Sequence, residues 1–218
     1  MTVKENKNTQ MKLSFIGIGK VGFALANNLQ KKGHDIIIGH NDLASKSVRS
    51  AQSKNQAFAA IPIQDAIEQS DITFLATPFK ANETILTPLD FGNNILVDCT
   101  NPVGAGLVHG LGSKISGAEK VQEWAKNARV VKSYTIYGFE NLANSDFPEY
   151  TTRPVMLIAG NDIDAKKQVR SLNTDLGFET LDVGNLPQSL HLEHMTLLWV
   201  KMVRANGHPN FTWAYLER

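Results

Sequence analysis

The feature that most constrains the fold is a glycine-rich turn near the N-terminus. Met11 to Ile16 is an apolar run that predicts a buried strand. Lys20 to Lys32 carries apolar residues at helical spacing and stops at Gly33, a residue that commonly ends helices. The segment that joins the two patterns is Gly17-Ile18-Gly19-Lys20-Val21-Gly22. A strand, a glycine turn and a helix in this order predict the first unit of an α/β sheet.

Each glycine of this G-x-G-x-x-G turn has a separate expected role. Gly17 permits the tight turn, Gly19 lets the backbone approach a pyrophosphate, and Gly22 lets the helix pack closely on the strand. The pyrophosphate would lie at the helix N-terminus, where unpaired N–H groups and the helix dipole favour negative charge. The turn therefore predicts dinucleotide binding. A glycine turn that serves packing alone is the alternative.

The end of the second strand indicates which dinucleotide binds. Enzymes that use NAD usually carry Asp or Glu there, to bond the ribose 2′-hydroxyl. Here Ile36-Ile37-Ile38 is followed by Gly39, His40 and Asn41, and the acidic residue comes later, as Asp42. His40 and Asn41, with Ser45 and Lys46, would offer donors to a 2′-phosphate. NADP(H) is favoured over NAD(H), although His40 as a plain turn residue stays open.

Further along the chain, strand patterns alternate with helical ones. The third to sixth strands are expected at 57–61, 71–76, 94–98 and 129–133, and further strands at 155–158 and 178–182. The longest helical pattern runs from Pro187 to Arg204. Continuous apolar strands between helices are typical of a parallel sheet covered on both faces. We expect an α/β fold, a Rossmann-type doubly wound parallel sheet with a small C-terminal α/β extension. We divide it into a flexible tail (1–10), a dinucleotide-binding domain (11–130) and a small C-terminal region that completes an acceptor cleft (131–218). A single compact unit is the alternative.

Composition excludes some classes of protein. The 218 residues include 22 Lys+Arg and 21 Asp+Glu, a balance that argues against nucleic-acid binding. No stretch approaches the roughly 20 apolar residues of a membrane span, and the polar first ten residues lack a signal core. The single cysteine, Cys99, fits a reducing compartment and reads as a buried thiol at a strand end. We expect a cytoplasmic protein without a membrane partner.

The chain carries an ordered series of short motifs. They are Gly33-His34-Asp35, Ala76-Thr77-Pro78, Val97-Asp98-Cys99-Thr100-Asn101-Pro102, Ser116-Gly117-Ala118-Glu119, Gly138-Phe139-Glu140-Asn141-Leu142-Ala143-Asn144, Leu176-Gly177-Phe178-Glu179 and Leu197-Leu198-Trp199. From Met11 to about Val203, this series resembles one family, the NADP oxidoreductases that depend on the deazaflavin coenzyme F420.

The resemblance implies hydride transfer between NADP(H) and a deazaflavin or flavin ring laid over the nicotinamide, in a protein commonly paired as a homodimer. It places Thr77, Pro78 and Phe79 at the end of the fourth strand, along the nicotinamide and its ribose. It places Thr100, Asn101 and Pro102 at the end of the fifth strand, also along the nicotinamide and its ribose. Ligands of open α/β sheets bind at these strand ends. Of these residues we favour Asn101 most, because its amide can bond the ribose or the carboxamide.

Two departures from the family pattern concern the site. Family members typically read Ser-Arg where this chain has His40-Asn41, so the arginine that would clamp the 2′-phosphate is absent. They typically read Lys-Ala-Phe-Asn-Thr where this chain has Lys132-Ser133-Tyr134-Thr135-Ile136. The second change makes the expected acceptor wall more apolar, under the glycine-rich loop 104–112.

Two histidines and two possible proton donors are further candidates for a metal site or for catalysis. His191 and His194 lie one helical turn apart, but the His-Glu-x-x-His pattern is absent, so we predict no metal site. Lys132 or Tyr134 would be available as a proton donor, yet hydride exchange between two rings needs mainly alignment. We therefore assign the catalytic role to no residue. The alternatives are a hydroxyacid or imine dehydrogenase of related fold, and an NADP(H)-binding sensor without turnover.

Overall fold

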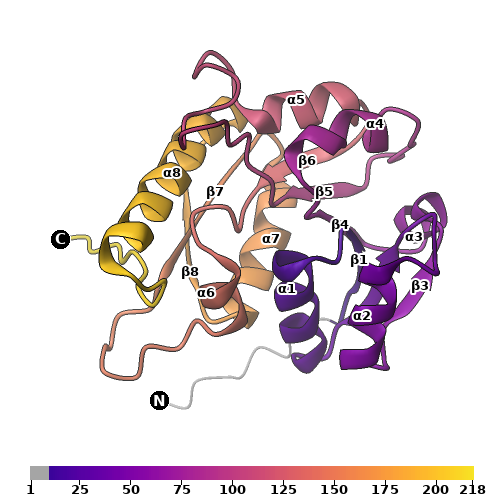
Figure 1. Ribbon diagram of the computed structural model, residues 1–218, viewed down its shortest axis with the longest axis horizontal. Coiled ribbons are helices and arrows are strands. Elements are labelled where there is room, and N and C mark those ends of the chain that lie inside the picture. The colour runs from indigo at the N-terminus through magenta and orange to yellow at the C-terminus, as the bar shows by residue number, and fades with distance from the viewer. Residues whose placement is uncertain (1–9) are drawn as a thin grey trace.

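The computed structural model describes residues 10–218, so nearly all of the expected tail (1–10) lies outside the described residues. From the N-terminus, strands and helices alternate as the sequence predicts (Figure 1). The first six strands are β1 (Lys12–Ile16), β2 (Asp35–Gly39), β3 (Ala59–Ile61), β4 (Ile72–Leu75), β5 (Ile95–Asp98) and β6 (Arg129–Lys132). The helices between them are α1 (Lys20–Lys31), α2 (Lys46–Lys54), α3 (Ile63–Glu68), η1 (Phe79–Ala81), α4 (Asn82–Leu86) and α5 (Gly117–Trp124).

All strands join one eight-stranded sheet, in the order β3-β2-β1-β4-β5-β6-β7-β8. The first six strands are parallel, so their carboxyl ends share one edge of the sheet. The chain runs outward from β1 to β3, returns to β4, and then runs outward the other way. Between β1 and β4 the strand order therefore reverses, which is where open α/β sheets bind their ligands.

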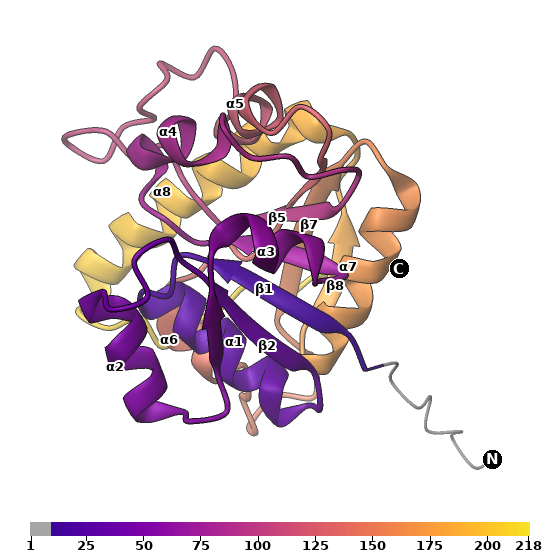
Figure 2. The same ribbon diagram turned by 90° about the vertical axis from the view of Figure 1, so that its right-hand side faces the viewer.

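The two faces of the sheet carry two hydrophobic clusters. One cluster takes residues of α1, α2 and three later helices, and the other takes residues of α3, α4 and α5. Neighbouring residues of one strand divide between them: Phe74 lies in the first and Leu75 in the second. Figure 2 shows α1 and α2 on one side of β1 and β2, with α3 on the other. Strands buried on both faces explain the continuous apolar runs of the sequence.

The C-terminal part of the chain extends the same sheet. It contains α6 (Phe139–Ala143), β7 (Val155–Gly160), α7 (Ile163–Asp175), β8 (Glu179–Asp182), η2 (Leu186–Gln188) and α8 (Ser189–Asn206). β7 pairs with β6 antiparallel, and β8 pairs with β7 parallel. The expected α/β class and doubly wound sheet are confirmed. The division expected near residue 130 falls inside β6 and stays a prediction.

Three short elements did not stand out in the sequence. They are η1, α4 and α6, each of three to five residues, which is too short to show an apolar periodicity. α8 reaches Asn206, two residues beyond the Arg204 that the pattern predicts, and ends at Gly207 in the left-handed conformation. No helix within residues 10–218 is long and apolar enough to cross a membrane.

Candidate functional site

The first glycine of the turn is held against the end of β4. Gly17 has a φ of +94°, a left-handed conformation that favours glycine. A Cβ on Gly17 would lie 2.7 Å from the Ala76 carbonyl and 2.8 Å from the Thr77 nitrogen. The turn therefore brings the glycine segment directly beside Thr77, one of the residues expected at the nicotinamide.

The other two glycines differ from each other. A Cβ on Gly22 would collide with the Gly17 carbonyl oxygen, so Gly22 is required by packing. A Cβ on Gly19 would meet no atom within 4 Å. Gly19 is the N-cap of α1, no side chain caps the helix, and its first turn has no acidic residue. Open space in front of uncapped helix N–H groups is the geometry of an anion site.

The residues between the glycines take three different places. Ile18 is buried in the core, Val21 is half-buried, and Lys20 is exposed. The Lys20 ammonium lies 4.8 Å from the centre of the Phe139 ring at the start of α6. Lys20 thus stands at the mouth of the turn without blocking Gly19.

The end of β2 presents His40, Asn41 and, after the N-cap Ser45, Lys46. Asn41 is turned toward α3, where its Oδ1 accepts from the Ile63 N–H at 3.1 Å. His40 Nδ1 accepts from the Asp42 N–H at 3.0 Å. Asp42 Oδ1 in turn accepts from the Ala44 N–H at 3.0 Å. Of the side chains expected around a 2′-phosphate, His40 is therefore engaged within its own loop and Asn41 with α3, whereas Lys46 is exposed.

A groove of about 970 Å³ runs over α1, between α2 and α6. This is the size of a site for a small organic ligand. Gly19, Lys20 and Lys46 line it, whereas His40 and Asn41 do not. Its lining residues are Ile18, Gly19, Lys20, Phe23, Ala24, Asn27, Asn28, Lys31, Lys46, Ser47, Ser50, Ala51, Lys54, Phe139 and Ala143. The lining contains four lysines and no carboxylate.

The ends of β4 and β5 are joined by a chain of hydrogen bonds. Thr77 Oγ1 donates to Asn82 Oδ1 at 2.6 Å, and Asn82 Nδ2 donates to Thr100 Oγ1 at 3.1 Å. Thr100 Oγ1 in turn donates to Asp98 Oδ1 at 2.7 Å. Asn82 is fully buried at the start of α4. The two segments expected at the nicotinamide are therefore fixed to each other through Asn82.

The remaining residues of these two segments differ in how exposed they are. Asn101 Nδ2 donates to the Thr135 carbonyl at 3.4 Å, and its Oδ1 accepts from Thr196 Oγ1 at 3.1 Å. Pro102 is buried, and Phe79 is half-buried with its ring 5.7 Å from that of Trp124. Pro78 is exposed. The amide of Asn101, which we favoured as a ligand, is thus already oriented by α8 and by the segment after β6.

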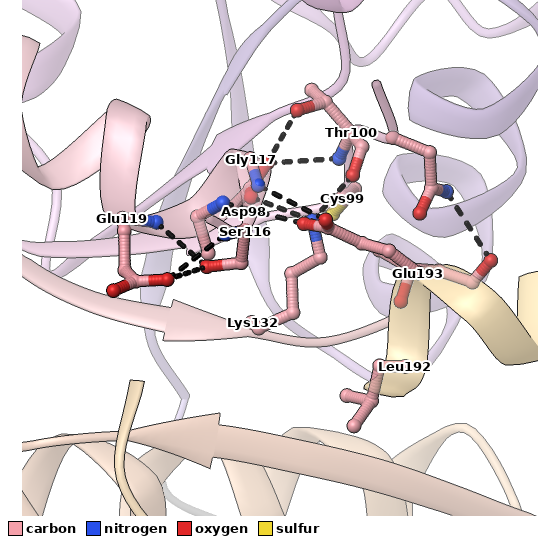
Figure 3. Close-up of polar contacts among 12 residues, drawn as sticks. Asp98, Cys99, Thr100, Ser116, Gly117, Glu119, Lys132, Leu192 and Glu193 are labelled. Atoms are coloured by element: carbon pink, nitrogen blue, oxygen red, sulfur yellow. Dashed lines mark hydrogen bonds and ion pairs between the residues drawn. The ribbon is translucent and has the colours of Figure 1, made fainter. Parts of the chain in front are cut away.

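A buried group of charges lies directly behind Thr100 (Figure 3). The Lys132 ammonium contacts Asp98 Oδ2 at 2.8 Å, the Thr100 carbonyl at 2.5 Å and Glu193 Oε1 at 2.9 Å. The three charged side chains have 0 or 1% exposure. Asp98 ends β5, Lys132 ends β6, and Glu193 belongs to α8. In the sequence, Asp98 and Lys132 stand out because each is a charged residue at the end of an apolar strand. The sequence gives no sign that Glu193 pairs with Lys132.

The pKa values of this group follow from its partners. Burial alone raises the pKa of Glu193, but the Lys132 charge and hydrogen bonds from His109 and Gly117 outweigh it, so the net shift is downward. Burial alone lowers the pKa of Lys132, yet Asp98 and Glu193 raise it above its ordinary value. Both side chains are therefore held in their charged forms.

His109 connects the glycine-rich loop to the same group. Its Nε2 lies 2.7 Å from Glu193 Oε2, and its Nδ1 accepts from the N–H groups of Leu111 and Ser113. With Nδ1 an acceptor, Nε2 carries the proton. The ring also stacks on that of His194 at 5.4 Å. In residues 10–218, no group of three or more His, Cys, Asp or Glu side chains is arranged to hold a metal ion.

The structure corrects two expectations about β6 and the segment after it. The Lys132 ammonium is engaged with Asp98, Glu193 and the Thr100 carbonyl. Tyr134 is 1% exposed, and its burial raises the pKa of the hydroxyl well above its ordinary value. Neither is therefore poised as a proton donor. Thr135 and Ile136 are 2% and 0% exposed, so they do not form an open wall as expected. Ile136 instead packs in the core. Cys99 is buried, as predicted.

Curated relatives match most of this chain but only part of their own length. Metalloreductase STEAP3 of Rattus norvegicus is 25% identical over 189 residues, which are 85% of this chain and 36% of that protein. An uncharacterized oxidoreductase of Shewanella frigidimarina is 28% identical over 126 residues, 58% of this chain and 37% of that protein. The chain thus spans little more than a third of the curated relatives it matches.

Solved structures share the fold. A candidate F420-dependent NADP reductase from Arthrobacter sp. FB24 superimposes with a TM-score of 0.80 at 22% identity, covering 95% of this chain and 100% of its own. A hypothetical protein from Sinorhizobium meliloti has a TM-score of 0.71 at 28% identity, covering 84% and 90%. Residues 12–102 match the family model described as NADP oxidoreductase, coenzyme F420-dependent. For this segment, the resemblance to the coenzyme F420-dependent NADP oxidoreductases that the motifs indicate is therefore confirmed.

Proposed function

We propose that this chain is an oxidoreductase that binds NADP(H) at its glycine turn and exchanges a hydride with a small ring-shaped acceptor, a deazaflavin or a flavin. The observation that carries the proposal is the space in front of Gly19. Gly17 and Gly22 are glycines because the protein's own backbone occupies the place of a side chain. Gly19 has no such neighbour, so its missing side chain is explained by a ligand that approaches the N-terminus of α1.

The parts of the cofactor have corresponding places along one edge of the sheet. The pyrophosphate fits at the α1 N-terminus, and the 2′-phosphate lies toward Lys46 and the end of β2. The nicotinamide falls beside Thr77, Thr100 and Asn101, at the ends of β4 and β5. The cofactor supplies the hydride. The side chains around it need only orient the ring and exclude water, since two rings exchange hydride by alignment.

The site constrains the hydride acceptor less than it constrains the cofactor. Proteins that match in sequence or fold carry names with different acceptors: a metalloreductase, an F420-dependent NADP reductase, a reductive aminase solved with NADPH and an imine reductase solved with NADPH4. Burial of Lys132 and Tyr134 removes two candidate proton donors and favours an acceptor that takes a hydride alone. The closed position of Thr135 and Ile136 favours a second candidate function, an NADP(H) sensor without turnover.

Single-turnover mixing separates the two functions. NADPH-loaded protein is mixed with a deazaflavin, a flavin or a ferric chelate, and the absorbance of the reduced nicotinamide is followed. We expect rapid loss of that absorbance with one of the ring acceptors. NADPH binding without oxidation by any acceptor would support the sensor instead, and no NADPH binding at all would refute both.

We also propose a cytoplasmic location and a homodimer. The single cysteine is buried and supports a reducing compartment, and the homodimer rests on the resemblance to the family. Light scattering of the purified protein tests the second proposal, and a monomer at all concentrations would contradict it.

A further inference from the structure

The buried charges behind Thr100 tie together four segments that are far apart in the sequence. Glu193, on α8, accepts from the Gly117 N–H at 3.0 Å and the Ala118 N–H at 3.3 Å, at the N-terminus of α5. The same carboxylate contacts Lys132 of β6 and His109 of the glycine-rich loop. Figure 3 shows Gly117 and Lys132 meeting Glu193 from different elements. One carboxylate thus fixes a strand end, a helix start and a loop.

Lys132 carries this connection to the candidate nicotinamide site. Its ammonium reaches the Thr100 carbonyl and Asp98, and Asp98 Oδ1 accepts from both the N–H and the hydroxyl of Thr100. Thr100 is therefore held by its nitrogen, its carbonyl and its side chain. Its hydroxyl also continues to Asn82 and so to Thr77. Any movement of the Lys132 ammonium is transmitted to both segments expected around the nicotinamide.

Core stability alone is a weak reason for such an arrangement. Buried ion pairs lose much of their Coulomb energy to desolvation, and well-packed apolar side chains often serve as well. They do fix one geometry, because each charge must keep its partners. This group lies at the carboxyl ends of β5 and β6, immediately behind the site, which is where fixed geometry matters for aligning two rings.

We propose that Glu193 is a positioning residue, which acts through Lys132 to hold Thr100, Asn101 and Pro102 where the nicotinamide ring must lie. This inference rests on the proposed function, because it assigns the ring to that segment. Glu193 touches neither ring. It sets the position of the Lys132 ammonium, and the ammonium sets the Thr100 carbonyl.

Glu193→Gln tests the proposal, because the amide keeps the shape but removes the charge that holds Lys132. We expect the single-turnover rate of NADPH oxidation to fall by about tenfold or more, the effect of a small misalignment. Binding of adenosine 2′,5′-bisphosphate, which lacks the nicotinamide half, should stay unchanged, while binding of whole NADPH weakens. Should Glu193→Gln fail to fold, Glu193→Asp retains the charge but shortens the reach, and the same three measurements apply.

Asp175→Asn is the matched control. Asp175 forms a buried pair with His34 at 3.1 Å, and His34 precedes β2, at the opposite edge of the sheet. Its loss should lower the melting temperature but leave all three measurements as in the unmodified protein. Equal effects of the two variants would overturn the positioning role. If the unmodified protein oxidises no NADPH, the proposed activity fails. The positioning role is then judged by the two binding constants, and equal changes in both would refute it.

Discussion

At the scale of single residues, the three glycines of the turn separate what the fold needs from what a ligand needs. Gly17 faces backbone atoms of Ala76 and Thr77, directly after β4, and Gly22 faces backbone atoms of the turn itself. Gly19 faces open space, and its φ of −72° is one that any residue adopts. The fold therefore tolerates a side chain at Gly19 and excludes one at Gly22.

Gly19→Val should accordingly abolish NADP(H) binding while leaving the protein folded, because the branched side chain fills the space of the pyrophosphate. Isothermal calorimetry measures the first effect, and thermal melting the second. Gly22→Ala is the matched change: its Cβ collides with the Gly17 carbonyl, so the melting temperature should fall. Unchanged affinity in Gly19→Val would mean that the turn serves packing alone.

Lys46 offers a second test at this scale. It is the exposed first residue of α2, near the end of β2. It lines the groove together with Gly19. Lys46→Glu should weaken binding of NADPH by about tenfold and leave binding of NADH unchanged, because only NADPH carries the 2′-phosphate. Lys114→Glu, in the loop before α5, serves as the control. Equal weakening for both cofactors would place the 2′-phosphate elsewhere.

At the scale of elements, the sequence predicts most of this molecule. Five of the six parallel strands stand out because they are buried on both faces and flanked by helices, whereas β3 is partly exposed. All six form as expected. The site segments at the ends of β4 and β5 were found because parallel strands bring their carboxyl ends to one edge. η1, α4 and α6 were missed, and with them Asn82, whose burial depends on the packing of the two strand ends.

The start of α5 shows how local sequence fixes one of these elements. Ser116 Oγ accepts from the Glu119 N–H at 3.1 Å, and Glu119 Oε2 accepts from the Ser116 N–H at 2.9 Å, a reciprocal capping box. Ser116→Ala should lower the free energy of unfolding by about 1 kcal/mol. Ser53→Ala, at an exposed site of α2, should have a much smaller effect in the same urea titration. Equal effects would show that the cap contributes nothing to α5.

At the scale of the whole molecule, two of the connections between the C-terminal part and the half that carries the glycine turn lie close to the candidate site. β7 continues the sheet beyond β6, and Glu193 of α8 completes the buried charges behind Thr100. The first connection follows from strand patterns after residue 129. The second was out of reach of the sequence, because Lys132 and Glu193 are brought together only by the packing of α8 against α5 and the sheet. The burial of Thr135 and Ile136 was missed for the same reason.

The buried charges also make the stability of the whole fold depend on pH. Glu193 has a pKa below its ordinary value of about 4.3, so its stabilising contribution is present above that value and is lost as the pH falls through the lower, folded pKa. Lys132 has a raised pKa, so its contribution is present below about 10.4 and is lost as the pH rises through the higher, folded pKa. The two contributions are therefore both complete between these limits.

This dependence predicts how Glu193→Gln compares with the unmodified protein as the pH changes. Near neutrality the variant leaves Lys132 with one carboxylate fewer, which should lower the free energy of unfolding by roughly 3 kcal/mol. In acid, below the folded pKa of Glu193, the unmodified side chain is itself protonated and resembles the amide, so the difference should shrink toward zero. Urea titrations of both proteins from neutral pH into the acid range measure this difference directly. A gap that stays constant through that range would show that Glu193 is not a charged partner of Lys132.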